Sequence, residues 1–362
     1  MNPVNEALWL ESRRGTFRVG PAPYTAPGPG EVVVGAHAVA VNPVDAVPAV
    51  ARRFVYPWLR YPTVLGTDVA GEVVAVGAGV KRFRVGDRVV GLATGQEKFR
   101  NDPAHGAFQR CVVLAADLTT PVPDHVALTD AVVLPLALST AAAALFEADQ
   151  LGLPLPSPTS PPAANASPTP SSQTVLVWGA STSVGMNAVQ LAAAAGHRVL
   201  ATASPHNFDL VRELGAAEVV DYRAPSVEGD LLDLLGGHNL AGTFAIGQGS
   251  LAPAVRIARA AAGSRRVASA YPGPATAVRR LLAKPSGVRV SAVWGGRPAT
   301  TDVGPAVFAG FLPTALAEGR YRVAPTAEVV GHELAAVPAA LERLRAGVSA
   351  RKLVVSLDPG PR

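Results

Sequence analysis

A run of small residues in the middle of the chain joins two apolar segments, and its backbone could bind a phosphate. The run is residues 179–185, GASTSVG, between the mostly apolar and β-branched residues 174–178 and the alanine-rich residues 186–195. A buried strand that turns directly into a helix leaves free N–H groups and the positive end of the helix dipole at the turn. Thr182 stands where a dinucleotide fingerprint would have its middle glycine, so an ordinary strand-turn-helix is the alternative.

The second segment with chemical potential follows the predicted strand at residues 197–204. In NAD sites a carboxylate about 20 residues beyond the glycines binds the ribose 2′-hydroxyl. Here the strand ends at Ser204, followed by Pro205, His206 and Asn207, and Arg223 lies further along. Ser204 and Asn207 can donate hydrogen bonds to a 2′-phosphate, which favours NADP(H) over NAD(H). Asn207 also suits the N-cap of a helix at 208–214, and both roles are compatible.

Alternating strands and helices surround these residues and predict a doubly wound parallel sheet. The remaining strands expected in it are residues 218–222, 242–246, 266–270 and 289–294, and the helices are 208–214, 227–235 and 251–262. Residues 152–173 contain seven prolines and no charge, and they predict an exposed, low-complexity insertion before the first strand.

The N-terminal part has short β segments with glycines at their corners, which predicts a small, partly open β-barrel. Its segments are residues 7–10, 17–19, 31–40, 65–77, 85–91 and 107–113, and the end of the chain, residues 308–357, resembles this part more than the parallel sheet. Residues 49–61 are rich in aromatic and basic side chains. They either pack in the core or form one wall of a substrate mouth.

Composition bounds these hypotheses. The 362 residues suggest about two domains, and 49% hydrophobic with only 16% charged residues allow a large core. The net charge is +5, but the arginines are scattered along the sequence, so we expect a mildly basic surface and no nucleic-acid groove. Cys111 is the only cysteine, which excludes an internal disulfide and a multi-cysteine zinc site and fits a cytoplasmic protein. We expect no signal peptide and no membrane span.

Four motifs together resemble the medium-chain dehydrogenase/reductase superfamily. They are residues 66–73 (GTDVAGEV), 86–89 (GDRV), 106–108 (GAF) and 178–185 (WGASTSVG). The resemblance implies a GroES-like catalytic domain interrupted by a Rossmann domain, with boundaries at residues 1–137, 138–305 and 306–362. Residues 42–45 (NPVD), residues 204–209 and the proline-rich insertion are most similar to fungal trans-acting enoyl reductases, which are stand-alone partners of iterative polyketide synthases.

Zinc-dependent members of that superfamily carry Gly-His-Glu where this chain has Gly66, Thr67 and Asp68, and they use cysteine ligands. The missing histidine and cysteines predict no zinc and therefore no alcohol oxidation of the zinc type. The resemblance implies instead that NADPH delivers hydride to the β-carbon of an enoyl thioester. Charge then builds on the thioester oxygen as an enolate.

The resemblance also implies the site residues. Thr140 would be catalytic and face nicotinamide and substrate, although a helix threonine also bonds its own backbone. The residues expected to contact the cofactor are Val44, Asp45, Val47, Ser181, Thr182, Ser183, Val184, Ser204, Pro205, His206, Asn207, Tyr222, Ser269, Ala270, Lys352 and Leu353. Relatives commonly have lysine at the position of Val47, which leaves the proton donor open among Tyr56, Tyr61 and water.

The leading hypothesis is an NADPH-dependent enoyl reductase acting on unsaturated thioesters that a polyketide synthase presents on its carrier domain. A free-standing quinone or enone reductase is the second hypothesis. The third, motivated by Val47, is an NADPH-binding protein that has lost its chemistry.

Overall fold

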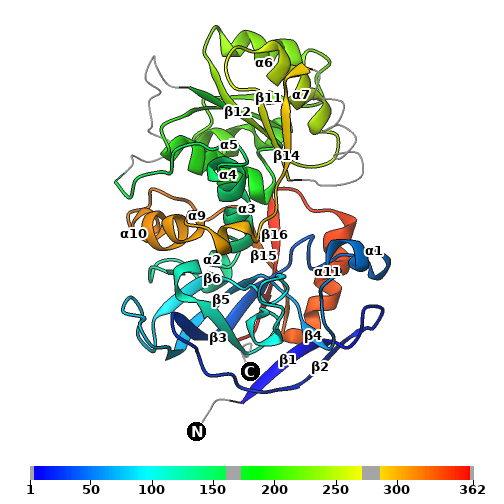
Figure 1. The fold of residues 1–362 in the computed structure, drawn as a ribbon, viewed down its shortest axis with the longest axis vertical. Coiled ribbons are helices and arrows are strands. Elements are labelled where there is room, and N and C mark those ends of the chain that lie inside the picture. The colour runs from blue at the N-terminus through cyan, green and yellow to red at the C-terminus, as the bar shows by residue number, and fades with distance from the viewer. Residues whose placement is uncertain (1–3, 160–172, 271–285, 359–362) are drawn as a thin grey trace. The chain divides into compact units, whose positions relative to one another are not determined.

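The computed structural model describes residues 4–159, 173–270 and 286–358, so most of the proline-rich insertion lies outside the described residues. The chain divides into unit 1, Met1–Leu136 with Thr326–Arg362, and unit 2, Ala137–Pro325 (Figure 1). The sequence placed the return to the first domain at residue 306, whereas it falls at Thr326. The segment before Thr326 stays with unit 2 because the Tyr321 hydroxyl donates to Asn187 Oδ1 at 2.7 Å and the Arg322 N–H donates to Gln190 Oε1 at 2.8 Å.

Unit 2 is built on a six-stranded parallel sheet in the order β11-β10-β9-β12-β13-β14. The strands are β9 (Thr174–Trp178), β10 (Arg198–Ala203), β11 (Glu218–Asp221), β12 (Leu240–Ala245), β13 (Arg266–Ser269) and β14 (Arg289–Ala292). The helices are α3 (Pro135–Phe146), which begins in unit 1, α4 (Ser183–Ala194), α5 (Phe208–Glu213), α6 (Val227–Leu235), α7 (Leu251–Ala260), α9 (Val303–Pro305), a π-helical stretch (Ala306–Phe311) and α10 (Leu312–Ala317). The doubly wound sheet expected from the alternating pattern is present.

Strand β9 is central because its side chains are apolar on both faces. Leu176 and Trp178 pack into a cluster with α6 and α7, which lie together on one side of the sheet (Figure 1). Val175 and Val177 alternate with them, point to the opposite face and are fully buried. Two-sided burial is the reason that residues 175–178 of this strand are all apolar before the turn.

Unit 1 contains the partly open β structure expected from its glycine-cornered segments. Its larger sheet has the order β15-β16-β3-β5-β6-β8 with β7 also paired to β3, and a smaller sheet has the order β2-β1-β4. The strands are β1 (Asn5–Leu10), β2 (Phe17–Ala22), β3 (Glu31–Ala40), β4 (Thr63–Val64), β5 (Asp68–Val76), β6 (Arg88–Leu92), β7 (Cys111–Ala115), β8 (Thr119–Pro121), β15 (Thr326–His332) and β16 (Arg351–Ser356). The helices are α1 (Ala49–Val55), α2 (Leu128–Ala131) and α11 (Val337–Ala346).

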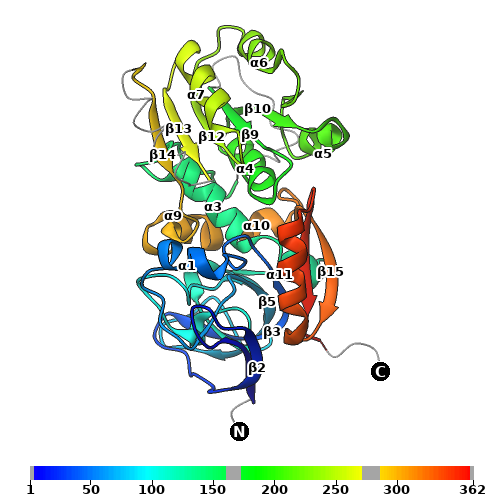
Figure 2. The ribbon, with the colours of Figure 1, turned by 90° about the vertical axis from the view of Figure 1, so that its right-hand side faces the viewer.

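The C-terminal segment completes unit 1. Strand β16 pairs antiparallel with β3 and parallel with β15, and α11 packs along the β15–β16 pair (Figure 2). The last strand is therefore a structural part of the N-terminal sheet.

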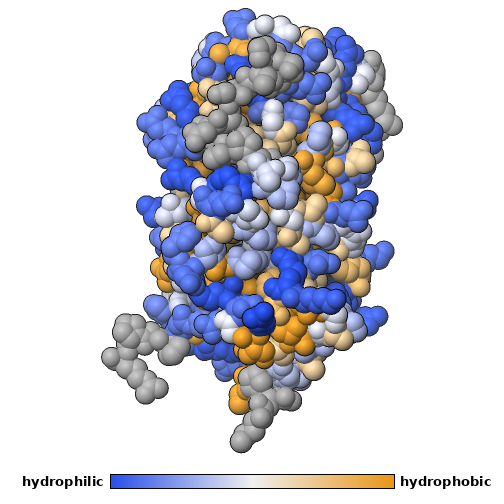
Figure 3. Space-filling model, turned by 90° about the vertical axis from the view of Figure 1, so that its left-hand side faces the viewer, coloured by the Kyte–Doolittle hydropathy of each residue, from blue (hydrophilic) through white to orange (hydrophobic). Residues whose placement is uncertain are grey.

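One apolar stretch is longer than the sequence led us to expect. Residues Leu128–Phe146, which form α2 and α3, have the length and hydropathy of a membrane span, but 78% of that window is buried inside the fold. A core helix passes the same test, and burial against protein accounts for its composition. Hydrophilic residues and smaller apolar areas are interspersed on the face in Figure 3.

Candidate functional site

The turn after β9 brings the start of α4 against the strand. Gly179 has φ +88°, a conformation that side chains disfavour, and it lets the chain reverse. A Cβ atom at Gly185 would lie 2.3 Å from the Gly179 carbonyl oxygen. Only glycine at this position permits the close approach of helix and strand, as the sequence predicted.

The predicted phosphate residues lie in this turn and on the first turn of α4. Thr182 is the N-cap: its hydroxyl accepts the Gly185 N–H at 3.0 Å and donates to the Gly179 carbonyl at 2.8 Å. The hydroxyl proton of Thr182 is thus already used within the turn. Ser183 Oγ is buried and has no hydrogen-bond partner among the described residues. The N–H groups of Ser183 and Val184 belong to the helix turn that has no internal acceptors. This part of the turn, with Ser181 beside it, fits an anionic ligand.

The predicted adenosine-end residues follow two neighbouring strands. Ala203 of β10 is in register with Asp221 of β11, so the segment 204–207 and Tyr222 leave the same edge of the sheet. Ser204 is buried, and Asn207 lies at the N-cap of α5 without a side-chain capping bond; its amide lies 3.2 Å from His206 Nε2 instead.

Arg223 adds a cation to this edge. Its guanidinium lies 4.8 Å from the centroid of the Tyr222 ring, and its backbone N–H donates to Asp221 Oδ1 at 3.0 Å. Asp221 is a carboxylate that sequence reasoning left out of this edge.

Ser269 and Ala270 lie on the same carboxyl edge, closer to the middle of the sheet. Ser269 is in register with Ala245, which is in register with Trp178, the residue before the turn. Ser269 ends β13 and is 1% exposed. The predicted cofactor residues of unit 2 thus gather along one edge, as parallel strands require.

Thr140 lies half-buried in α3. Its neighbour Ser139 is fully buried and donates to the Gly295 carbonyl at 2.6 Å, which fixes the helix against the loop after β14. Nothing in the geometry tests the catalytic role predicted for Thr140.

The predicted residues of unit 1 lie in and beside a buried polar cluster. The turn after β3 is closed by Asp45, whose Oδ2 accepts the Asn42 N–H at 2.9 Å. Asp45 Oδ1 is buried and has no hydrogen-bond partner in the described part of the chain. Burial, and secondarily the charge of Asp68, raises the pKa of Asp45 to about 7, so its carboxyl is protonated in a large fraction of molecules at neutral pH.

Lys352 occupies the middle of this cluster and pairs with Asp68 of β5. The ammonium also donates to the Val133 carbonyl at 3.1 Å, and both charged side chains are at most 4% exposed. Asp68 Oδ2 further accepts the Asn42 amide at 2.9 Å, whose Nδ2 is 3.0 Å from Thr67 Oγ1. The sequence predicted that Lys352 closes over nicotinamide. In the structure its ammonium is bound instead by Asp68 and the Val133 carbonyl, both in unit 1.

The sequence reasoning did not find the pair between Lys352 and Asp68. A signal existed: each charged residue begins or borders an apolar β run, and a buried charge requires a partner. Which charges meet is decided by the pairing of β16 with β3 and of β3 with β5, which no local pattern encodes.

The other unit 1 predictions have different surroundings. Val44 and Val47 are half-buried in the turn after β3, and Leu353 is fully buried in the core. In the aromatic segment Tyr56 is buried and accepts the Gln96 amide at 3.0 Å, which favours the packing role there. Burial raises the pKa of Tyr56 well above its usual value, so its hydroxyl keeps its proton.

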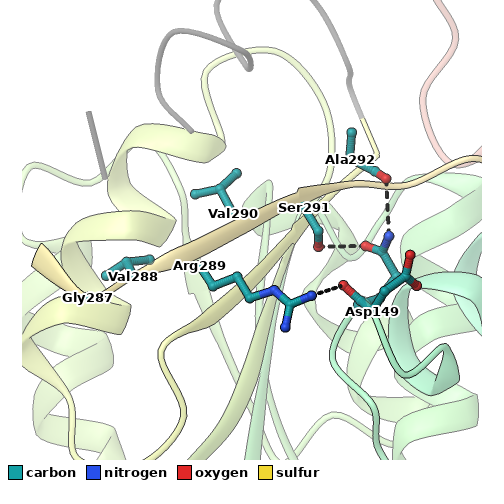
Figure 4. Close-up of a pocket in the computed structure, with 8 residues that line it drawn as sticks. Asp149, Gly287, Val288, Arg289, Val290, Ser291 and Ala292 are labelled. Atoms are coloured by element: carbon teal, nitrogen blue, oxygen red, sulfur yellow. Dashed lines mark hydrogen bonds between the residues drawn. The ribbon is translucent and has the colours of Figure 1, made fainter. Parts of the chain in front are cut away.

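A separate hollow of about 520 Å³ lies against the edge strand β14 (Figure 4). The Ser291 hydroxyl donates to Gln150 Oε1 at 2.6 Å, and Arg289 Nη2 donates to the Asp149 carbonyl at 3.4 Å. None of the residues predicted to bind the cofactor lines it.

Residues 28–124 match the family model "Alcohol dehydrogenase GroES-like domain". The chain is 42% identical to "Dehydrogenase pigH" of Monascus ruber (98% of this chain, 100% of the relative) and 38% identical to "Zinc-binding alcohol dehydrogenase domain-containing protein cipB" of Emericella nidulans (98% and 99%). It is 35% identical to "Trans-enoyl reductase himH" of Aspergillus japonicus (98% and 98%). An alcohol dehydrogenase superfamily protein from Novosphingobium aromaticivorans superposes with a TM-score of 0.73 at 25% identity, over 98% of this chain and 100% of the other.

Proposed function

The chain belongs to the medium-chain dehydrogenase/reductase superfamily, and from this premise we propose that it is an NADPH-dependent enoyl reductase that acts in trans with a polyketide synthase. Similarity over nearly the full length to a relative named as a trans-enoyl reductase supports this specific role. The substrate would be an α,β-unsaturated thioester on the carrier domain of the synthase. The proposal also places the protein in the cytoplasm.

The observation that carries the proposal is the closed network around Lys352. Zinc enzymes of this superfamily have histidine and glutamate in the segment of Thr67 and Asp68, and one relative of this chain is named as zinc-binding. In this chain the Asp68 carboxylate is already neutralised by the Lys352 ammonium, and the neighbouring donors are an amide and a hydroxyl. Within the described ranges, no group of three histidine, cysteine or acidic side chains is placed to hold a metal. The residues do not fit zinc, which supports a reaction that needs no Lewis acid.

The residues of unit 2 do fit a phosphorylated dinucleotide. The orphaned hydroxyl of Ser183 and the N–H groups at the start of α4 would bind the pyrophosphate. Ser204, Asn207 and Arg223 would hold the 2′-phosphate, since each offers donors and they leave one edge of the sheet. The reduced nicotinamide, when bound, supplies the hydride.

Thr140 has the simplest role in this proposal. Its hydroxyl would donate a hydrogen bond to the thioester oxygen, where negative charge develops as the double bond is reduced. The hydrogen bond from the Asn42 N–H to Asp45 Oδ2 closes the turn that carries Val44 and Val47.

The proposal is tested by following NADPH absorbance with an enoyl-pantetheine thioester, with a quinone, and with no acceptor. Turnover of the thioester alone supports it. Turnover of the quinone alone would establish a free-standing quinone reductase instead. Tight NADPH binding without turnover of either acceptor would identify a protein that has lost its chemistry, the hypothesis that Val47 motivates.

A further inference from the structure

Five arginines from three separate parts of the sequence gather on one side of unit 1. They are Arg13 and Arg14 in the turn between β1 and β2, Arg52 and Arg53 on α1, and Arg345 on α11, and we name this set the arginine face. Figure 1 shows the turn, α1 and α11 on the same side of unit 1. The sequence, in which these residues are far apart, predicted only a scattered positive charge.

Hydrogen bonds join the three segments of the arginine face. Arg52 Nη1 donates to the Arg13 carbonyl at 2.9 Å, which ties the β1–β2 turn to α1. Arg345 Nε and Nη2 donate to the Ala46 carbonyl at 3.0 and 2.9 Å, which ties α11 to the turn that leads into α1. The arginine face is therefore a built arrangement held by backbone carbonyls.

The arginines of this face form no ion pair in the described part of the chain. None of the five guanidinium groups has a described carboxylate within 4.0 Å. The acids on the same segments are Glu11, which pairs with Arg18 at 2.7 Å, and Glu342 on α11.

Arg52 is the buried member of the arginine face. It is 5% exposed, and its Nε has no hydrogen-bond partner within the described ranges. Burial lowers the pKa of Arg52; Tyr61 opposes this shift and the charge of Arg345 adds to it, yet a guanidinium stays charged in proteins. A buried cation without an anion is costly, and an anion bound from outside would relieve part of that cost.

Two large apolar side chains are exposed beside these charges. Val50 and Phe54 are 73% and 72% exposed, and at a spacing of four residues they lie on the same side of α1. The Arg53 guanidinium lies 4.5 Å from the centroid of the Phe54 ring. Exposed aromatic residues next to arginines are the composition that marks the centre of protein interfaces.

We propose that the arginine face, together with Val50 and Phe54, is the docking surface for an acidic carrier domain that presents the substrate on its phosphopantetheine arm. This inference rests on the proposed function. Such an arm is attached through a phosphodiester, so the partner brings an anion at the point where the arm leaves it. Opposite charges also accelerate the encounter of the two proteins, and this acceleration falls with salt.

The test compares turnover of the same acyl thioester attached either to free pantetheine or to a carrier domain. A crotonyl thioester is offered to the full-length enzyme either on free pantetheine or on an isolated carrier domain of a polyketide synthase. The variant is the double charge reversal Arg13→Glu with Arg53→Glu, because both side chains are exposed. The matched control is Arg259→Glu, an exposed arginine on α7 of unit 2.

We expect the double variant to lower kcat/KM for the carrier-bound substrate by about tenfold or more, with the free pantetheine thioester unaffected and with weaker salt dependence. Arg259→Glu should change neither value. An unchanged rate with carrier-bound substrate, or an equal loss with both substrates, would overturn the docking surface while leaving the proposed function intact. Absence of turnover by the unmodified enzyme with both supports would overturn the proposed function itself.

Discussion

Replacing Asp45 by asparagine should change how the stability of the protein depends on pH. Asp45 is 1% exposed, its Oδ2 accepts the Asn42 N–H, and its Oδ1 has no hydrogen-bond partner among the residues that the structure describes. Its pKa is about 7 in the folded protein, because burial disfavours the carboxylate and Asp68 adds like charge, while Lys352 opposes the shift. In the unfolded chain the pKa returns to 3.8.

The two pKa values give the sign and the size of the change in the free energy of unfolding with pH. Between pH 3.8 and about 7 the unfolded chain releases the Asp45 proton and the folded protein retains it, so the unfolded chain gains stability as the pH rises. At about 1.4 kcal/mol per pKa unit, the folded protein loses roughly 4 kcal/mol over the whole interval. The contribution is fully favourable below the unfolded pKa and is lost once the pH exceeds the folded one. Asparagine has a similar shape and cannot ionise, so the variant lacks this loss.

The measurement is the free energy of unfolding in urea at several values between pH 4 and pH 8, for the unmodified protein and for Asp45→Asn. The difference between the two proteins should be small near pH 4 and should grow with pH in favour of the variant. Asp124→Asn, at an exposed carboxylate of unit 1, serves as the control and should run parallel to the unmodified protein. Parallel curves for Asp45→Asn as well would refute a protonated, buried Asp45.

Three further substitutions test the other parts of the site. Ser204→Asp should weaken NADPH binding by about tenfold or more in calorimetric titration, because the new carboxylate would face the 2′-phosphate. The affinity for NADH should hardly change. Equal losses of affinity for both cofactors would remove Ser204 from the contact with the 2′-phosphate. Thr140→Val should lower kcat by about 10²-fold with NADPH affinity intact, and an unaltered kcat would end its catalytic assignment. Lys352→Met leaves Asp68 buried without a counter-charge and should reduce the free energy of unfolding by about 3–5 kcal/mol. The control Arg351→Met, at an exposed residue, should have little effect. Similar losses for the two variants would show that the pair is not stabilising.

The part of the site that the sequence could predict is the part encoded locally. Thr174–Trp178, the glycine-cornered turn and the uncharged helix after it are adjacent in the chain, and each element has its own composition signal. The role of Gly185 follows because only a missing side chain permits the observed approach. Local order even placed Ser204 and Tyr222 at the ends of neighbouring strands.

The part that could not be predicted depends on contacts between distant segments. The pairing of Lys352 with Asp68, and the gathering of Arg13, Arg52 and Arg345, each require strands and helices from both ends of the sequence to meet. The boundary at Thr326, later than the sequence predicted, also depends on a contact between distant segments: the Tyr321 hydroxyl donates to Asn187 of α4. Side-chain patterns report burial and periodicity but not partners.

The place of β16 in the sheet of unit 1 has a consequence for synthesis. A nascent chain emerges from the ribosome with β3, β5 and Asp68 long before Lys352, and all of unit 2 lies between them. Until Arg351–Ser356 is translated, β3 lacks one neighbour and Asp68 lacks its cation. Unit 2 can therefore mature while the first-made segment still awaits its last strand, so a chain arrested before codon 352 would expose an unfinished sheet edge to chaperones and proteases.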